Sequence, residues 1–286
     1  MKEFFQNIFF FTVLILIVNL LLLKIADDLY YRKYEKVDLS YNTYLMSDSH
    51  GHTLGNLTEN FGIYNFSAGS ESYFDMYIKV KFLINHSKID KLLITVDDHT
   101  LSMYRESMNN LDRSAFFYEL DLNDNFNESL KSLKNKFVKR YFVLSNIKAR
   151  DVIKLYFNSK LVKKNIVKKD WESWYYKKQK ESSINRFNFQ FSHKKSNMLT
   201  SSLQEIINLC KNNNIELIGI KFPLTKEYIS TLGDNSFGAE NIFESNNIRV
   251  VDFKNIYLKN DEYFHDQDHL NRKGSIEFVK TLSNEF

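Results

Sequence analysis

The stretch that decides the fold is NTYLMSDSHG, residues 42–51. Its first five residues are typical of a short buried strand, and a polar turn follows them at once. Four further apolar runs of strand length occur later in the chain. They span residues 63–66, 91–96, 215–222 and 248–253. The sequence therefore predicts five strands, with the polar turn of residues 47–51 at the end of the first.

Helical patterns separate these strands. Apolar residues recur at helical spacing over residues 72–87, and residues 199–210 and 274–285 are also typical of helices. Apolar strands that alternate with helices predict a parallel sheet with helices on both faces, a flavodoxin-like α/β fold. Polar residues crowd the carboxyl ends of the strands, where open α/β sheets bind their ligands.

The most informative chemical motif lies near the end, in FHDQDHLNRKG, residues 264–274. Asp266 precedes His269 by three residues on a tight loop that leads into the last helix. At this spacing the carboxylate can fix the imidazole tautomer while the other ring nitrogen faces a nucleophile. Ser49 is well placed to be that nucleophile, because a seryl hydroxyl needs a neighbouring base to take its proton.

Four blocks of sequence, in this order, resemble the SGNH/GDSL hydrolase superfamily. They are Ser47-Asp48-Ser49, Asn65-Phe66-Ser67-Ala68-Gly69, Thr95-Val96-Asp97-Asp98 and Asp266-x-x-His269-Leu270-Asn271. The resemblance covers about residues 40–100 and 199–286. It implies Ser49 as the nucleophile, His269 as the base and Asp266 as the residue that orients it.

The resemblance also implies an oxyanion hole formed by the amides of Ser49 and Gly69 and by a side chain of the third block. Asp97 stands where the family has Asn, and a carboxylate donates to an oxyanion only when protonated. Either Asn65 or His99 supplies that donor, or activity is altered. A serine esterase or O-acyltransferase and an inactive glycan-binding protein of the same fold therefore both stay open. The polar residues expected to contact a substrate are Asp48, His50, Asn65, Asp98 and His99.

Other interpretations of the same turns remain. Ser49 would also suit a helix N-cap beside His50. The group His265, Asp266, Asp268 and His269 would suit a divalent metal ion. The turn at residues 48–51 also matches the opening Asp-x-His of metal-dependent phosphoesterases, but their other segments do not occur in the sequence. We expect neither a metal nor a cofactor.

The N-terminus predicts a membrane anchor. Residues 4–23 contain no charge, and about 20 apolar residues at a rise of 1.5 Å cross a ~30 Å hydrocarbon core. No small-x-small cleavage site follows, which argues against a signal peptide. We therefore predict a single-pass anchor over residues 1–24 that contacts membrane lipid, a polar stalk over 25–40 and a globular domain over 41–286.

The location follows from the resemblance. Membrane-tethered members of the superfamily commonly add or remove acetyl groups on cell-surface polysaccharides. The resemblance thus implies a bacterial cell membrane protein with an extracytoplasmic catalytic domain, an acylated glycan or glycolipid substrate, and a membrane acyltransferase as a candidate partner. The positive-inside rule opposes this orientation, because four cationic residues follow the span. They are Lys24, Arg32, Lys33 and Lys36.

A basic, mainly helical insertion is expected over about residues 100–198. Residues 131–195 contain 19 Lys and Arg against four acidic residues, with Trp171, Trp174, Tyr175 and Tyr176 among them. The insertion is either a solvated lid or a surface for an anionic partner, a lipid headgroup or an acidic glycan. Nucleic acid is disfavoured by the anchor and by the lack of a recognition motif. The cations singled out for such a partner are Lys163, Lys164, Lys168 and Lys169.

Composition excludes several protein classes. The 286 residues are 43% hydrophobic and 26% charged, which argues against a disordered or collagen-like chain. The single cysteine, Cys210, excludes an internal disulfide and a cysteine-based zinc site.

Overall fold

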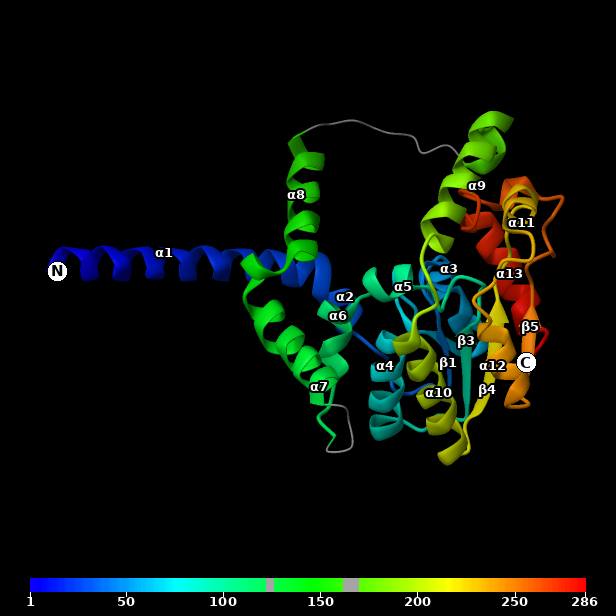
Figure 1. The fold of residues 1–286 in the computed structure, drawn as a ribbon, viewed down its shortest axis with the longest axis horizontal. Helices are drawn as coiled ribbons and strands as arrows, with labels where there is room; N and C mark the ends of the chain where they lie inside the picture. The colour runs from blue at the N-terminus through cyan, green and yellow to red at the C-terminus, as the bar shows by residue number, and fades with distance from the viewer. Residues whose placement is uncertain (122–125, 162–169) are drawn as a thin grey trace. The chain divides into compact units, whose positions relative to one another are not determined.

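The computed structural model describes residues 1–121, 126–161 and 170–286, which form two compact units (Figure 1). Unit 1 comprises residues 1–37 and 111–166, and unit 2 comprises residues 38–110 and 167–286. The chain therefore enters each unit twice. The cations of residues 163–169 lie outside the described residues.

A five-stranded parallel sheet forms the centre of unit 2, in the order β2-β1-β3-β4-β5. The strands are β1 (Thr43–Met46), β2 (Ile63–Asn65), β3 (Lys91–Thr95), β4 (Glu216–Lys221) and β5 (Val250–Asp252). All five predicted strands are confirmed, with ends that differ by a few residues. Because the strands are parallel, their carboxyl ends and the loops that follow meet at one edge of the sheet.

Helices cover both faces of this sheet (Figure 1). Leu45, Leu93 and Ile218 are register neighbours on three adjacent strands. Register neighbours on adjacent strands point to the same face of the sheet. These three side chains therefore form one core with α13 (Arg272–Ser283). The α13 residues in this core are Phe278, Val279 and Leu282. Helices α4 (Tyr73–His86) and α10 (Asn197–Asn212) pack together over the other face. The predicted flavodoxin-like architecture is thus confirmed.

Shorter helices occupy the loops of unit 2. They are α3 (Ser49–His52), α5 (Met103–Ser107), α11 (Lys226–Leu232) and α12 (Ala239–Ser245). A longer one, α9 (Tyr176–Phe191), also belongs to unit 2. The insertion expected over residues 100–198 is therefore divided: α9 belongs to the unit that contains the sheet, and residues 111–166 belong to unit 1.

Unit 1 contains the long N-terminal helix α1 (Lys2–Ala26), which is long and apolar enough to cross a membrane. The helical path continues through a π-helical turn at Asp27–Tyr31 into α2 (Arg32–Glu35). The other α-helices among the described residues of the unit are α6 (Leu111–Ser114), α7 (Phe126–Leu133) and α8 (Ile147–Leu161).

The stalk predicted over residues 25–40 is in part a packed helix. Ala26 and Tyr31 are fully buried, in one apolar cluster with Val143, Ala149 and Ile153. Two carboxylates of this segment are also paired, because Arg140 lies 2.7 Å from both Asp27 and Glu35. Packing and ion pairing thus order residues whose polar composition predicted a stalk.

Candidate active site

The turn after β1 places Ser49 at the carboxyl edge of the sheet, as the first residue of α3. The Asp48 carboxylate caps this short helix by accepting a hydrogen bond from the N–H of His50 at 3.0 Å. Gly51 is required by space, because a Cβ there would lie 2.6 Å from the Cβ of Ser47. The tight contact holds the turn against the end of β1.

Three side chains form one hydrogen-bonded chain at this edge. The Oγ of Ser49 lies 2.8 Å from Nε2 of His269, and Nδ1 of His269 lies 2.8 Å from Oδ1 of Asp266. The same Oδ1 accepts hydrogen bonds from the N–H groups of Asp268 and His269 at 3.2 and 3.0 Å, which orient the carboxylate. This arrangement lets a neutral imidazole take the hydroxyl proton of Ser49. The structure thus brings together the three residues expected to be catalytic.

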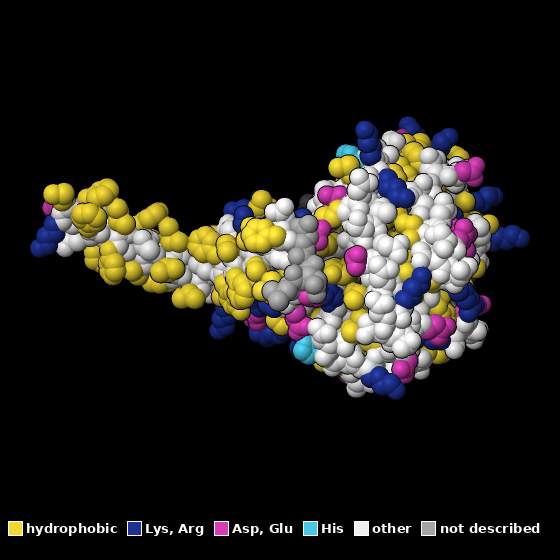
Figure 2. Space-filling model, turned by 60° about the horizontal axis from the view of Figure 1, so that its bottom comes forward, with side chains coloured by type: hydrophobic (Ala, Val, Ile, Leu, Met, Phe, Trp, Pro, Cys, Tyr) yellow, Lys and Arg dark blue, Asp and Glu magenta, His cyan; other side chains and the backbone are white. Residues whose placement is uncertain are grey.

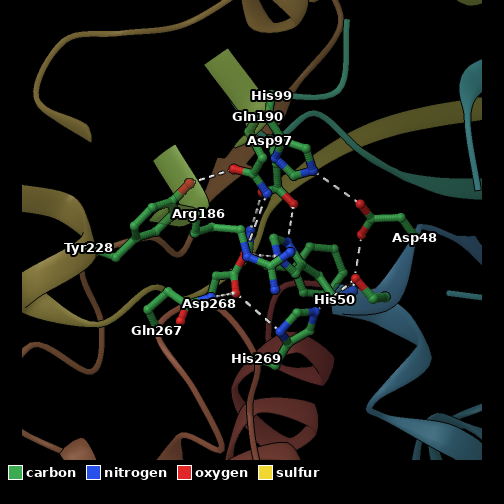
Figure 3. A network of polar contacts seen from close by, with 12 residues as sticks. Asp48, His50, Asp97, His99, Arg186, Gln190, Tyr228, Gln267, Asp268 and His269 are labelled. Atoms are coloured by element: carbon green, nitrogen blue, oxygen red, sulfur yellow. Dashed lines mark hydrogen bonds and ion pairs between the residues drawn. The ribbon is translucent and has the colours of Figure 1, made fainter. Parts of the chain in front are cut away.

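A second carboxylate, that of Asp268, faces the same imidazole (Figure 3). One of its oxygens lies 3.1 Å from Nδ1 of His269. Its other oxygen lies 3.1 Å from Nε of Arg186 and 3.5 Å from Nε2 of His50. Asp268 is almost fully buried, so three cationic or potentially cationic groups surround one carboxylate away from water.

The pairing of Asp268 with His269 changes the titration of both residues. Burial raises the pKa of Asp268, but the His269 imidazole and the Arg186 guanidinium outweigh burial and hold it well below its usual range. Burial lowers the pKa of His269, but the carboxylates of Asp268 and Asp266 outweigh burial and raise it to about 9. His269 is therefore mostly protonated near neutral pH, and it acts as a base only after losing that proton.

Helix α9 holds the other side of this loop. The side-chain amide nitrogen of its Gln190 lies 3.5 Å from the Asp268 carboxylate. The Tyr228 hydroxyl donates a hydrogen bond to the side-chain oxygen of Gln190. Its Ser182 hydroxyl donates to the side-chain oxygen of Gln267 at 2.7 Å. The segment expected to be a lid thus contributes residues that fix the loop carrying His269.

Asp97 is not an oxyanion donor. It is a buried acceptor, and its Oδ2 lies 2.6 Å from Nδ1 of His50 and accepts from the Thr95 hydroxyl at 2.9 Å. Its Oδ1 accepts from the N–H of Phe222 at 2.8 Å. Burial lowers the pKa of His50, but Asp48 and Asp97 raise it well above its usual value. The charge of Asp97 is therefore balanced by an imidazolium, which removes the reason for expecting it to oppose an oxyanion.

The remaining residues expected to contact a substrate are engaged inside the protein. The Asp48 carboxylate lies 2.7 Å from Nη2 of Arg105 and 3.1 Å from Nε2 of His99. Burial raises the pKa of Asp48, but Arg105 and the two neighbouring imidazoles hold it well below its usual range. Burial also lowers the pKa of His99, so this ring is neutral.

Asp98 is likewise paired. It lies 3.2 Å from Nζ of Lys221 and 3.1 Å from Nζ of Lys254. A cavity of ≈ 10 Å³ adjoins Asp98, His99 and His50, no larger than one water molecule. In this structure these buried pairs hold Asp48, His99 and Asp98 against other side chains of the protein.

The candidate oxyanion donors that remain are backbone amides. Asn65 does not contribute, because its amide nitrogen donates to the carbonyl oxygens of Gly51 and Gly55 at 2.8 and 2.9 Å. Among the described residues, the N–H groups of Ser49 and Gly69 have no hydrogen-bond acceptor. These two amides are available to a developing negative charge.

A surface hollow of ≈ 380 Å³ lies beside the hydrogen-bonded chain. Its lining includes Trp174, Arg186, Phe189, Asp266 and Gln267. A larger hollow of ≈ 530 Å³ lies around Lys273 and Glu262 and contains none of the three residues expected to be catalytic. The smaller hollow combines aromatic and polar groups, as ligand sites commonly do, and Asp266 of the hydrogen-bonded chain is part of its lining.

The four aromatic residues expected to cluster in the insertion differ in how deeply they are buried. Trp171 is buried in the core of unit 2, and its backbone N–H donates to the backbone carbonyl oxygen of Phe264 at 3.1 Å. Trp174 is partly buried, with the Lys178 ammonium 3.5 Å from its ring centre. Tyr175 and Tyr176 are exposed. Only Trp174 of these four lines the hollow.

The four residues considered as a metal cluster are not gathered at one point. His265 faces Asp170, with Nδ1 2.9 Å from the carboxylate. Possible ligand atoms of His50, Asp268 and His269 lie within 4.8 Å of one another, as do those of Asp48, His50 and Asp97. The guanidinium of Arg186 contacts Asp268 and that of Arg105 contacts Asp48, so both groups already hold a cation. We therefore interpret them as hydrogen-bonded charge pairs.

Three solved structures are similar to this chain. An acylhydrolase-type protein from Bacteroides fragilis has 10% identity and a TM-score of 0.41, covering 90% of this chain and 94% of its own. A GDSL-like lipase from Bacteroides thetaiotaomicron has 8% identity and a TM-score of 0.44, with 89% and 95% covered. A lipolytic-type protein of the G-D-S-L family from Desulfitobacterium hafniense has 10% identity and a TM-score of 0.40, with 86% and 100% covered. No family model and no curated protein sequence matches the chain. At these values the likeness carries no residue role to this protein.

Several residues of the site have no sequence signal. Arg186 and Gln190 reach Asp268 from a helix about 80 residues earlier in the chain. Arg105 lies in a short helix outside every recognised block. Asp268 lies inside the last block, but its position between two imidazoles depends on how the turn after β1 packs.

Proposed function

We propose that this protein is a membrane-anchored, serine-dependent acyl-ester hydrolase or O-acyltransferase of the SGNH type. The observation that carries the proposal is the chain from Ser49 through His269 to Asp266, with both distances at 2.8 Å. It lies at the carboxyl edge of a parallel sheet, beside a hollow large enough for part of a substrate.

The groups present are sufficient for acyl transfer. The Ser49 oxygen attacks the ester carbonyl carbon while Nε2 of His269 takes its proton. The amides of Ser49 and Gly69, which have no acceptor among the described residues, would donate to the oxyanion. The protonated His269 then gives its proton to the departing alkoxide, which leaves the acyl group on Ser49. Water completes hydrolysis, whereas a sugar hydroxyl as the second acceptor gives transfer.

We propose an acylated cell-surface polysaccharide or glycolipid as the substrate. Two features of the chain support this class. Helix α1 is long and apolar enough to span a membrane, and Trp174, Phe189 and Arg186 offer aromatic and hydrogen-bonding surface around a hollow that Asp266 also lines. A membrane acyltransferase is a candidate donor of acyl groups in the transfer reaction.

The nucleophile is tested with the full chain in detergent and a small aryl acetate. We expect Ser49→Ala to reduce turnover by about 10³-fold or more and to abolish labelling by a fluorophosphonate. Ser67→Ala, a partly buried serine near the same turn, is the matched control. Turnover by Ser49→Ala at the wild-type rate would exclude this mechanism. A wild-type protein that neither turns over esters nor reacts with the probe would favour the glycan-binding alternative.

We propose that the protein belongs to a bacterial cell membrane. A cell-surface substrate then requires unit 2 to lie outside the cytoplasm. Alkaline phosphatase fused after Phe286 should then be active, because that reporter folds only where disulfides form. An inactive fusion, together with an active cytoplasmic reporter at the same position, would reverse the orientation. The substrate class would in that case become a lipid-linked precursor.

A further inference from the structure

Unit 1 keeps a large set of apolar side chains outside its core. They are Phe126, Leu130, Phe137, Val138, Tyr141, Phe142, Ile147, Leu155, Tyr156 and Phe157. Figure 2 shows hydrophobic side chains continuing from α1 onto the part of the molecule beside it. Proteins surrounded by water rarely expose so many large apolar groups together, so a partner is expected to cover this surface.

The surface begins at the end of the apolar segment of α1. The Asn19 amide donates to the Tyr141 carbonyl oxygen at 2.9 Å, and Leu22 and Leu23 pack against the cluster that contains Val143. Asn19 precedes the last residue of the uncharged segment, Leu23, by four positions. At 1.5 Å per residue, Tyr141 therefore lies about 6 Å inside the end of the apolar span.

Helix α8 runs across the end of α1 rather than along it (Figure 1). Two of its side chains, Ala149 and Ile153, are buried in the core of unit 1. Ile147 and Leu155 are 63% and 67% exposed, and Phe157 is exposed as well. If α1 spans a bilayer, a helix that crosses it at this level lies along the membrane surface.

Charge complements the apolar groups. Residues 126–159 contain eight Lys and Arg against two acidic residues. Cations among aromatic and aliphatic side chains are typical of segments that lie in the headgroup region, where rings enter the acyl boundary and cations meet lipid phosphates.

We infer that unit 1 is a membrane-surface domain in which α8 and residues 137–142 lie in the headgroup region of the leaflet from which α1 emerges. The occupant of the apolar surface is the bilayer itself, with anionic lipids preferred. The inference requires α1 to span the membrane and does not depend on the proposed chemistry. Its consequence is that the protein is held by a span and a lateral surface together.

The test uses the full chain in vesicles of phosphatidylcholine and phosphatidylglycerol. Ile147→Cys and Phe157→Cys are labelled with a nitrobenzoxadiazole fluorophore, and Asp234→Cys, an exposed site in unit 2, is the control. The native Cys210 does not interfere, because it is buried and burial raises the pKa of its thiol to about 12. Tyr141→Cys serves as a third position on the surface.

We expect fluorophores on unit 1 to be quenched several-fold more by lipids with a nitroxide near the headgroup than by aqueous iodide. The control label should show the opposite order. Iodide quenching at positions 147, 157 and 141 as strong as at position 234 would overturn the inference, including the case in which a protein covers this surface in the cell. The Ser49→Ala chain should give the same quenching as wild type, so failure of this inference is distinct from failure of the proposed enzyme.

Discussion

The two halves of the basic, aromatic segment have similar composition and different environments. Residues 126–159 leave most of their rings exposed. Residues 171–191 bury Trp171 in the core of unit 2 and direct Arg186 to the carboxylate of Asp268. A count of charges and aromatic residues therefore does not separate a membrane-facing surface from a support of the site. The neighbours of each side chain do.

The largest difference between the halves should appear in stability. Trp171→Ala removes a side chain that is 1% exposed and leaves a cavity, so we expect a loss of about 3–5 kcal/mol in the free energy of unfolding. Urea titration of the full chain in detergent, followed by circular dichroism, measures it. Tyr176→Ala, an exposed ring five residues later, should change stability by less than about 0.5 kcal/mol.

The substitution Ile147→Ala tests the stability contribution of an exposed apolar residue in unit 1. Its side chain is exposed, so in detergent we again expect a change below about 0.5 kcal/mol. A loss at Ile147 equal to that at Trp171 would show that the apolar surface of unit 1 is packed against protein. The contrast between the halves would then disappear.

A smaller effect, graded with pH, should come from His269. Since its pKa is raised to about 9, kcat/KM for an aryl acetate should rise about tenfold per pH unit from neutrality and level off near pH 9. The stability from the charged imidazole has the opposite trend. It is complete below the ordinary pKa of 6.5 and is lost as the pH rises through about 9. Stopped-time assays with enzyme-free blanks, and urea titrations at each pH, measure the two trends.

Asp268→Asn identifies the cause of that raised pKa. With one carboxylate removed, the inflection in kcat/KM should move to lower pH, while the neutral amide keeps the volume of the side chain. Asp234→Asn, an exposed acidic residue, should leave the inflection in place. An unmoved inflection in Asp268→Asn would show that Asp266 alone sets the pKa of His269.

The strands and the Ser49–His269–Asp266 chain could be predicted because their signals are local. Each strand is a short apolar run, and each polar turn follows directly on a strand or precedes a helix. The environment of Asp97 could not be predicted, since it depends on the His50 ring turning toward it and on the backbone of Phe222 arriving from another strand. The packing of the segment predicted to be a stalk, residues 25–40, could not be predicted either. Its burial depends on residues 143–153, which return to it from far along the chain.

Each unit is built from two separate segments of the chain, and this determines which truncated forms of the protein can fold. A cut after Lys24 would remove the membrane segment and also separate Leu22 and Leu23 from their partners around Val143 and Ile153. The shortened protein would keep residues 111–161 without the helix they fold against. Such a fragment would expose newly uncovered apolar surface and would be prone to aggregate. To obtain a soluble fragment that consists of unit 2, both segments of unit 1, residues 1–37 and 111–166, would have to be removed together.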